Sequence, residues 1–191
     1  GTTASGSTSD YAACAGTKPV NAGDLDGWDN NTPPVPVGSN GLIVAADNVT
    51  FDGVVGNSRL RTWRSRVKFA NVPDGLSNTV LMGEKHLIRA ELLDDAVDAG
   101  IFNGDKHRTN ARIMGVSGNG IEVTLGTGPT DNAGPTNNSD ARYQRNFGSW
   151  HSGVCNFGFG DGSVRTLRTN LDVTMLSRLG SRNDGLTVSL D

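Results

Sequence analysis

The chain has 191 residues, with 17 Lys and Arg against 20 Asp and Glu, and its formal net charge is −3. Its basic residues form no sustained patch, which argues against nucleic-acid binding; Arg59, Arg61, Arg64 and Arg66 are interpreted as the solvated face of one strand. No stretch approaches eighteen consecutive apolar residues, so we expect no membrane span in this chain.

The abundance of 26 glycines, together with many Asn, Thr and Ser, favours short strands joined by tight turns. Residues 1–10 are rich in Gly, Ser and Thr and are predicted to be a flexible segment before a single globular domain over 11–191. Strands are expected over the short apolar run 41–46, over 62–70, where Trp63, Val67 and Phe69 alternate with basic residues, and over 79–87 and 120–126.

The remaining elements follow from local patterns. A short helix is predicted within 87–100, and an exposed loop over 126–141. The aromatic alternation in 154–159, followed by Asp161-Gly162, predicts a two-residue hairpin turn in which both residues have positive φ. A closing helix is predicted with Asn170 as its N-cap and with Gly180 at its end. The fold class is therefore α+β and β-rich, an antiparallel sheet with tight hairpins and one or two short helices packed on it.

Cys14 and Cys155 are the only cysteines, and their spacing matches no metal site. The even count and the composition fit an exported protein in which a Cys14–Cys155 disulfide joins the N-terminal segment to the strand after Val154. The alternative is a pair of separate buried thiols.

Asp24, Asp26 and Asp29 place three carboxylates around a Gly turn, as oxygen-rich calcium loops do. Val35 stands where an EF-hand would have its final Glu, so an ordinary Asp/Asn-rich turn is the alternative. Any cofactor would be structural calcium at these residues.

No pattern of residues indicates catalysis. His151 follows Trp150 at the start of a strand, a setting more typical of a hydrogen-bonded packing residue than of a general base. No Ser lies in a G-x-S-x-G elbow, and the three histidines lie on unrelated segments. We therefore expect a protein that is not an enzyme.

Three stretches carry a family resemblance: "FGSWHSGVCNFGFGDGSVRTL", "VPDGLSNTVLMGEK" and "SDYAACAG". They resemble the planctomycete prepilin-type family of unknown function that is named for a His, nine residues and Asp-Gly. Here the motif is His151, Asp161 and Gly162. The second stretch, with Leu76 in place of the family's usual Thr, contributes the motif residues Asp74, Gly75, Ser77 and Asn78.

The resemblance implies a pilin-like globular domain and no catalytic residues. Members of the family typically begin with a type IV pilin-like leader and a long apolar helix. This chain has neither, so we expect that they were cleaved or trimmed, or that it associates through other surfaces.

The expected function is an exported structural subunit, located outside the cell or at its surface, of a filament or pseudopilus-like assembly. Its partner is expected to be other copies of the chain, with residues 1–10 a candidate for strand addition. The alternative is a surface module that binds a carbohydrate or solute by stacking on Trp28, Trp63 or Trp150.

Overall fold

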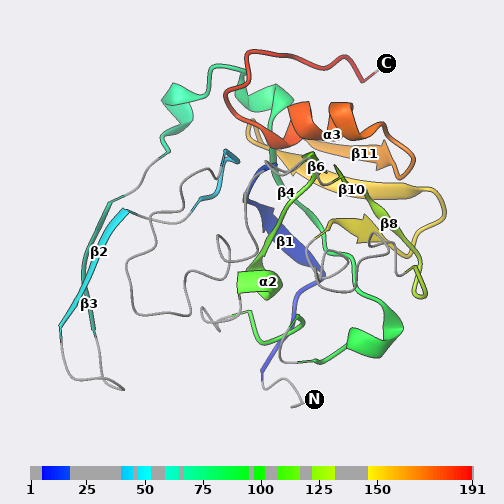
Figure 1. Ribbon diagram of the computed structural model, residues 1–191, viewed down its shortest axis with the longest axis horizontal. Coiled ribbons are helices and arrows are strands. Elements are labelled where there is room, and N and C mark those ends of the chain that lie inside the picture. Colours follow the sequence, from blue (N-terminus) through cyan, green and yellow to red (C-terminus); the bar gives the residue numbers. More distant parts are fainter. Residues whose placement is uncertain are drawn as a thin grey trace.

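The computed structural model describes residues 6–17, 40–44, 47–52, 59–64, 67–94, 97–101, 107–116, 122–131 and 146–190. Its centre is a five-stranded sheet in the order β11-β10-β4-β1-β5 (Figure 1). These strands are β1 (Tyr11–Cys14), β4 (Val80–Glu84), β5 (Ala111–Arg112), β10 (Val154–Phe159) and β11 (Val164–Arg168). All pairings are antiparallel except that of β1 with β5. The fold is thus α+β and strand-rich, as predicted.

Smaller elements surround the sheet. Two-stranded ladders join β2 (Asp47–Asp52) to β3 (Arg59–Arg64), β6 (Gly115–Val116) to β7 (Glu122–Val123), and β8 (Gly126–Thr127) to β9 (Gly148–Ser149). The β2–β3 hairpin projects from the body of the molecule (Figure 1). The helices are η1 (Phe69–Asn71), η2 (Leu76–Asn78), η3 (Arg89–Glu91), α2 (His107–Asn110) and α3 (Val173–Gly180). Across the described ranges, no helix has both the length and the apolar character needed to cross a membrane.

The core lies between one face of the sheet and α3. Alternate residues of β10, Cys155, Phe157 and Phe159, are buried, because successive side chains of a strand point to opposite faces. Phe157 packs edge-to-face on Phe147, with ring centroids 5.4 Å apart. Leu176 and Leu179 of α3 close this core.

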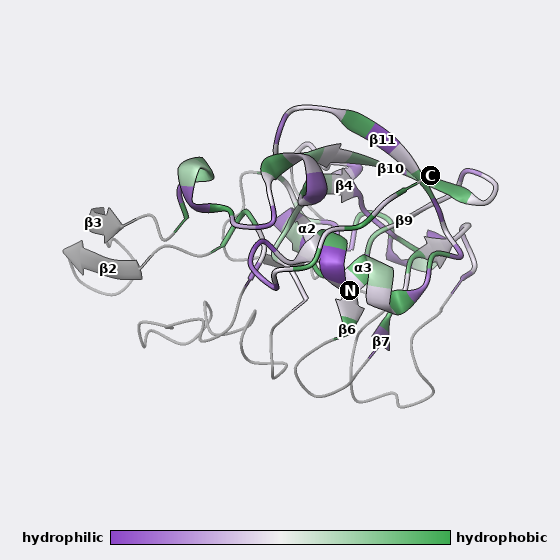
Figure 2. Cartoon of the chain, turned by 90° about the horizontal axis from the view of Figure 1, so that it is seen from above, coloured by the Kyte–Doolittle hydropathy of each residue, from purple (hydrophilic) through white to green (hydrophobic). Residues whose placement is uncertain are grey.

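Helix α3 lies beside β6 (Figure 2). The contact is close: the Val116 amide donates to Ser177 Oγ over 2.6 Å, and a Cβ on Gly115 would overlap Ser177. The helix begins after Asp172, whose carboxylate accepts the Thr174 amide at 2.8 Å. The predicted N-cap, Asn170, is therefore wrong by two residues, since the Asp172 carboxylate is the one that reaches the first free amides.

Several predicted elements differ in the structure. Strand β3 ends at Arg64, and Phe69, expected on a buried strand face, is an exposed residue of the 3-10 helix η1. The described part of 87–100 holds η3 and turns in place of a longer helix. Residues 41–44 form bends and no strand.

The N-terminal segment is anchored before the sheet begins. The Ser7 carbonyl accepts the Ile101 amide at 2.9 Å, and the Asp10 carbonyl accepts the Lys85 amide at 2.7 Å. Residues 1–5 of the predicted flexible segment lie outside the described residues.

Candidate functional site

The three motif stretches meet in adjacent strands. Strand β4, from "VPDGLSNTVLMGEK", lies between β1, from "SDYAACAG", and β10, from "FGSWHSGVCNFGFGDGSVRTL". Tyr11 lies opposite Glu84, and Phe157 lies opposite Gly83. Motifs separated by more than a hundred residues of sequence therefore form one continuous surface of the sheet.

Glu84 joins these strands through its carboxylate. Its Oε2 accepts the Asn156 amide at 2.6 Å, and its Oε1 accepts Asn156 Nδ2 at 3.3 Å. Asn156 Oδ1 in turn accepts the Thr166 hydroxyl at 2.7 Å. The chain of polar contacts thus runs from β4 across β10 to β11.

His151 lies at one end of this series of polar contacts. Its Nε2 is 3.5 Å from Glu84 Oε1, and its side chain is 67% exposed, while that of Glu84 is 12% exposed. The structure therefore places the motif histidine on the surface, as a partner of Glu84.

Asp161 and Gly162 shape the β10–β11 turn. The Gly162 amide donates to the Phe159 carbonyl, the Phe159 amide donates to the Ser163 carbonyl, and only Gly162 has a positive φ, of 85°. The loop therefore has three residues, a turn followed by a left-handed glycine, and the predicted two-residue turn is wrong. The Ser163 hydroxyl and amide both donate to Asp161 Oδ1, and they lower the pKa of this exposed carboxyl.

Asp74 is a buried carboxylate that binds the C-terminal segment. Its two oxygens accept the amides of Asp184 and Gly185 at 2.8 and 2.9 Å. Gly75 takes a positive φ of 85°, and the Asn78 side chain donates to the Asp74 carbonyl. Ser77 is an exposed residue of η2. Asp74, Gly75 and Asn78 thus fold a turn and attach another segment to it.

The two glycine-containing motifs also touch each other. The Gly160 amide donates to the Thr79 carbonyl at 3.0 Å, and a Cβ at Gly160 would lie 2.9 Å from the Leu76 side chain. The hairpin turn and the turn before β4 therefore pack together at one end of the sheet.

The predicted disulfide is not formed. Cys14 and Cys155 are separate buried thiols, on β1 and β10, with β4 between these two strands. Two strand spacings are roughly 9.5 Å, beyond the reach of about 7 Å between the Cα atoms of a disulfide. Burial raises the pKa of Cys14 to about 12 and also raises that of Cys155.

Other predicted site residues lie elsewhere. Asp24, Asp26, Asp29 and Trp28 fall outside the described residues, as does the side chain of Trp63. Within the described ranges, no three His, Cys, Asp or Glu residues cluster as metal ligands would. Trp150 is exposed on one side and donates from Nε1 to the Leu87 carbonyl at 2.8 Å.

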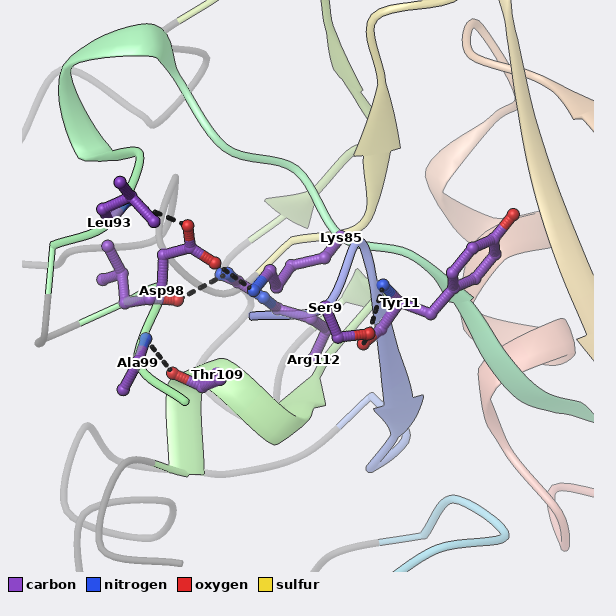
Figure 3. Close-up of polar contacts among 9 residues, drawn as sticks. Ser9, Tyr11, Lys85, Leu93, Asp98, Ala99, Thr109 and Arg112 are labelled. Carbon is purple, nitrogen blue, oxygen red and sulfur yellow. Dashed lines mark hydrogen bonds and ion pairs between the residues drawn. The ribbon is translucent and has the colours of Figure 1, made fainter. Parts of the chain in front are cut away.

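The sequence analysis missed a buried ionic cluster beside β1 (Figure 3). Lys85 Nζ lies 2.7 Å from Asp98 Oδ1, and Arg112, fully buried, contacts the Val97 carbonyl nearby. Burial lowers the pKa of Lys85, although Asp98 opposes this shift. The only sequence signal was the alternation along 79–87, and a bulge in β4 shifts that alternation so that Lys85 is buried.

Comparison with known proteins identifies a family and little more. The family described as "Protein of unknown function (DUF1559)" matches residues 8–174, which include all three motif stretches. No curated protein and no solved structure matches the chain.

Proposed function

The chain belongs to the DUF1559 family, and from this premise we propose that it is an exported, non-enzymatic structural subunit of an extracellular or cell-surface assembly. The finer form of the proposal, a pilin-like subunit of a filament or pseudopilus, is supported by the resemblance of its motifs to planctomycete prepilin-type proteins. In this proposal the subunit binds other copies of itself.

The observation that carries the proposal is the sheet face opposite α3. Strand pairing aligns one row of residues across all five strands: Val164, Gly158, Met82, Ala13 and Ala111. Residues that pair across strands share a face of the sheet, so this row is apolar from edge to edge. Val164 is 75% exposed and Met82 40% exposed. Exposed apolar side chains such as Val164 and Met82 on an outer sheet face are typical of a protein contact surface.

The roles of the motif residues are consistent with this function. Asp74, Asn78 and Asp161 use their polar atoms on backbone groups and neighbouring turns. Such contacts stabilise the fold from within and leave the outer face of the sheet free for contacts with other molecules. The proposal therefore treats the family motifs as the elements that build the sheet.

Self-association of the purified chain tests the proposal. We expect assemblies in sedimentation velocity and ordered filaments or sheets in electron micrographs, and we expect Met82→Glu to abolish both by placing a charge in the apolar row. Leu186→Glu is the matched control, since Leu186 is 49% exposed but lies in the C-terminal segment. A parent chain that stays monomeric, or a Met82→Glu variant that assembles like the parent, would contradict the proposal.

The proposal includes a structural calcium ion bound by Asp24, Asp26 and Asp29. If these carboxylates hold a structural ion that orders an assembly contact, then a chelator disperses the assemblies and added calcium restores them. Assemblies that are unchanged by the chelator would contradict this part alone.

A second candidate function, a surface module for carbohydrate or solute, is favoured by Trp150. Its indole N–H is held by the Leu87 carbonyl, so the ring is fixed in place while part of it stays exposed. Fixed, exposed indoles stack on sugar rings at low entropic cost. This candidate predicts a monomer whose Trp fluorescence is quenched saturably by an oligosaccharide, and Trp150→Ala removes the quenching.

A further inference from the structure

Lys85 and Asp98 form a direct contact in the interior of the protein. Lys85 Nζ lies 2.7 Å from Asp98 Oδ1, and the two side chains are 0% and 4% exposed. They come from different segments, since Lys85 directly follows β4 and Asp98 lies in the segment before α2. The amine and the carboxyl are thus held together by the fold, which gives an intramolecular reaction between them a high effective concentration.

Burial disfavours the charged form of Lys85. A buried ion pair loses the hydration of both charges, so transfer of one proton from Nζ to Oδ1 relieves part of that cost. Burial lowers the pKa of the amine against the opposing effect of Asp98, and Arg112, a second positive charge beside Lys85 (Figure 3), adds to the lowering. An unprotonated amine is the form that acts as a nucleophile.

The second carboxylate oxygen is held by a strained backbone amide. Leu93 donates its N–H to Asp98 Oδ2 at 2.9 Å, and its φ is 61°, the left-handed conformation that residues with a side chain rarely adopt. Among the described residues it is the only one other than glycine with a positive φ. A fixed amide aimed at an oxygen that gains negative charge is the arrangement that stabilises a tetrahedral intermediate.

We propose that Lys85 and Asp98 join in an intramolecular isopeptide bond, formed by the folded chain without an enzyme or a cofactor. Nζ passes one proton to Oδ1 and attacks Cγ of Asp98, which forms the new C–N bond. A second proton then moves from Nζ to Oδ1, the Cγ–Oδ1 bond breaks, and one water molecule leaves. Oδ2 becomes the oxygen of the new amide and keeps its hydrogen bond from Leu93.

The bond would tie the end of β4, which pairs with both β1 and β10, to the segment before α2. It also replaces a buried ion pair with a neutral amide, so it removes the cost of two buried charges. This inference stands on the cluster alone and does not depend on the proposed self-association.

Peptide mapping of the natively folded chain tests the proposal. Trypsin cleaves after unmodified Lys and Arg, so the linked form yields peptide 69–89, uncleaved at Lys85, joined to peptide 90–106. We expect this joined species, lighter than the sum of the two peptides by one water, with fragment ions that place the link at Lys85 and Asp98. Separate peptides cleaved at Lys85, from a chain incubated folded at neutral pH, would overturn the proposal.

Two variants give the matched controls. Lys68→Arg changes an exposed lysine that precedes η1 and keeps the cleavage site, so the joined peptides persist. The double variant Lys85→Met with Asp98→Leu removes both reacting groups and both charges, so the joined species is lost without leaving one charge buried alone. Dehydration at an Asp-Gly sequence also removes one water, but it joins no two peptides, and the mapping therefore separates the two reactions.

Discussion

Asp74 shows how one side chain of a family motif can hold a distant part of the chain. Its buried carboxylate accepts two amides of the C-terminal segment, and the Arg182 carbonyl accepts the Asp74 amide. The Arg182 side chain donates to the Gly41 carbonyl, so the same segment also reaches the residues after position 40. The motif turn is thus a point where three separate segments are joined.

We predict that Asp74→Ala lowers the free energy of unfolding by about 2 kcal/mol, because two hydrogen bonds to a charged acceptor are lost. Asp74→Asn keeps one acceptor oxygen, so its free energy of unfolding should lie between those of Asp74→Ala and the parent. Urea unfolding, followed by circular dichroism, measures the change.

Asp161→Ala is the control for this prediction. Asp161 accepts hydrogen bonds only within its own exposed turn, so its loss should shift the unfolding midpoint less. An Asp161→Ala variant as unstable as Asp74→Ala would contradict the argument that attachment of the C-terminal segment makes the larger contribution.

At the scale of elements, β4 depends on a glycine that faces the core. A Cβ at Gly83 would overlap the ring of Phe157 and lie 3.1 Å from that of Phe147. The two rings pack edge-to-face, so neither can withdraw without breaking their contact. The glycine therefore makes room for the aromatic pair at the centre of the sheet.

We predict that Gly83→Ala destabilises the fold by about 3 kcal/mol, the upper part of the range for overpacking a close-packed core. Gly162→Ala supplies the comparison, because Gly162 has a φ of 85° and nothing lies within 4 Å of an added Cβ. Its destabilisation should come only from the left-handed backbone and amount to about 1 kcal/mol. Thermal unfolding of both variants measures the difference, and equal losses would contradict the packing argument.

A bulge in β4 explains why the burial of Lys85 escaped the sequence pattern. Gly158 pairs with Met82 and Phe159 with Val80, so Leu81 is an extra residue on β4. An extra residue in a strand shifts the alternation of its side chains, so the residues beyond the bulge point to the face opposite to the one that strict alternation predicts. Val80 is therefore buried, and so are Gly83 and Lys85, although strict alternation would put Val80 and Lys85 on opposite faces.

At the scale of the whole molecule, the two cysteines report on global unfolding. Both are fully buried in the main core, and burial raises the pKa of Cys14 to about 12. In the unfolded chain a thiol titrates near its ordinary pKa of 9.0, so between these two values the unfolded state loses protons that the folded state keeps. The free energy of unfolding therefore falls as the pH rises above about 9.

We predict that neither thiol reacts with iodoacetamide in the native protein at pH 8 and that both react once urea unfolds it. The alkaline loss of stability should be smaller in Cys14→Ala than in the parent when each is compared between pH 8 and pH 10. Unfolded protein that takes up label only after reduction would show that a disulfide had formed, contrary to this structure.

The sequence by itself determined the features that depend on neighbouring residues. The alternation of Cys155, Phe157 and Phe159 and the burial of Leu176 and Leu179 follow from the periods of a strand and a helix. The class of fold follows as well, because glycine, turn residues and alternating apolar runs favour short strands. All three motif stretches lie within residues 8–174, which match a family of unknown function.

Only the tertiary structure decided which distant segments meet. The insertion of β4 between β1 and β10 separates Cys14 from Cys155, and it aligns Tyr11, Glu84 and Asn156 on one face. The same assembly buries Lys85 against Asp98, a contact that a bulge and a strained Leu93 make possible. Strand order and register arise from packing between segments far apart in sequence, and local propensity contains no information about them.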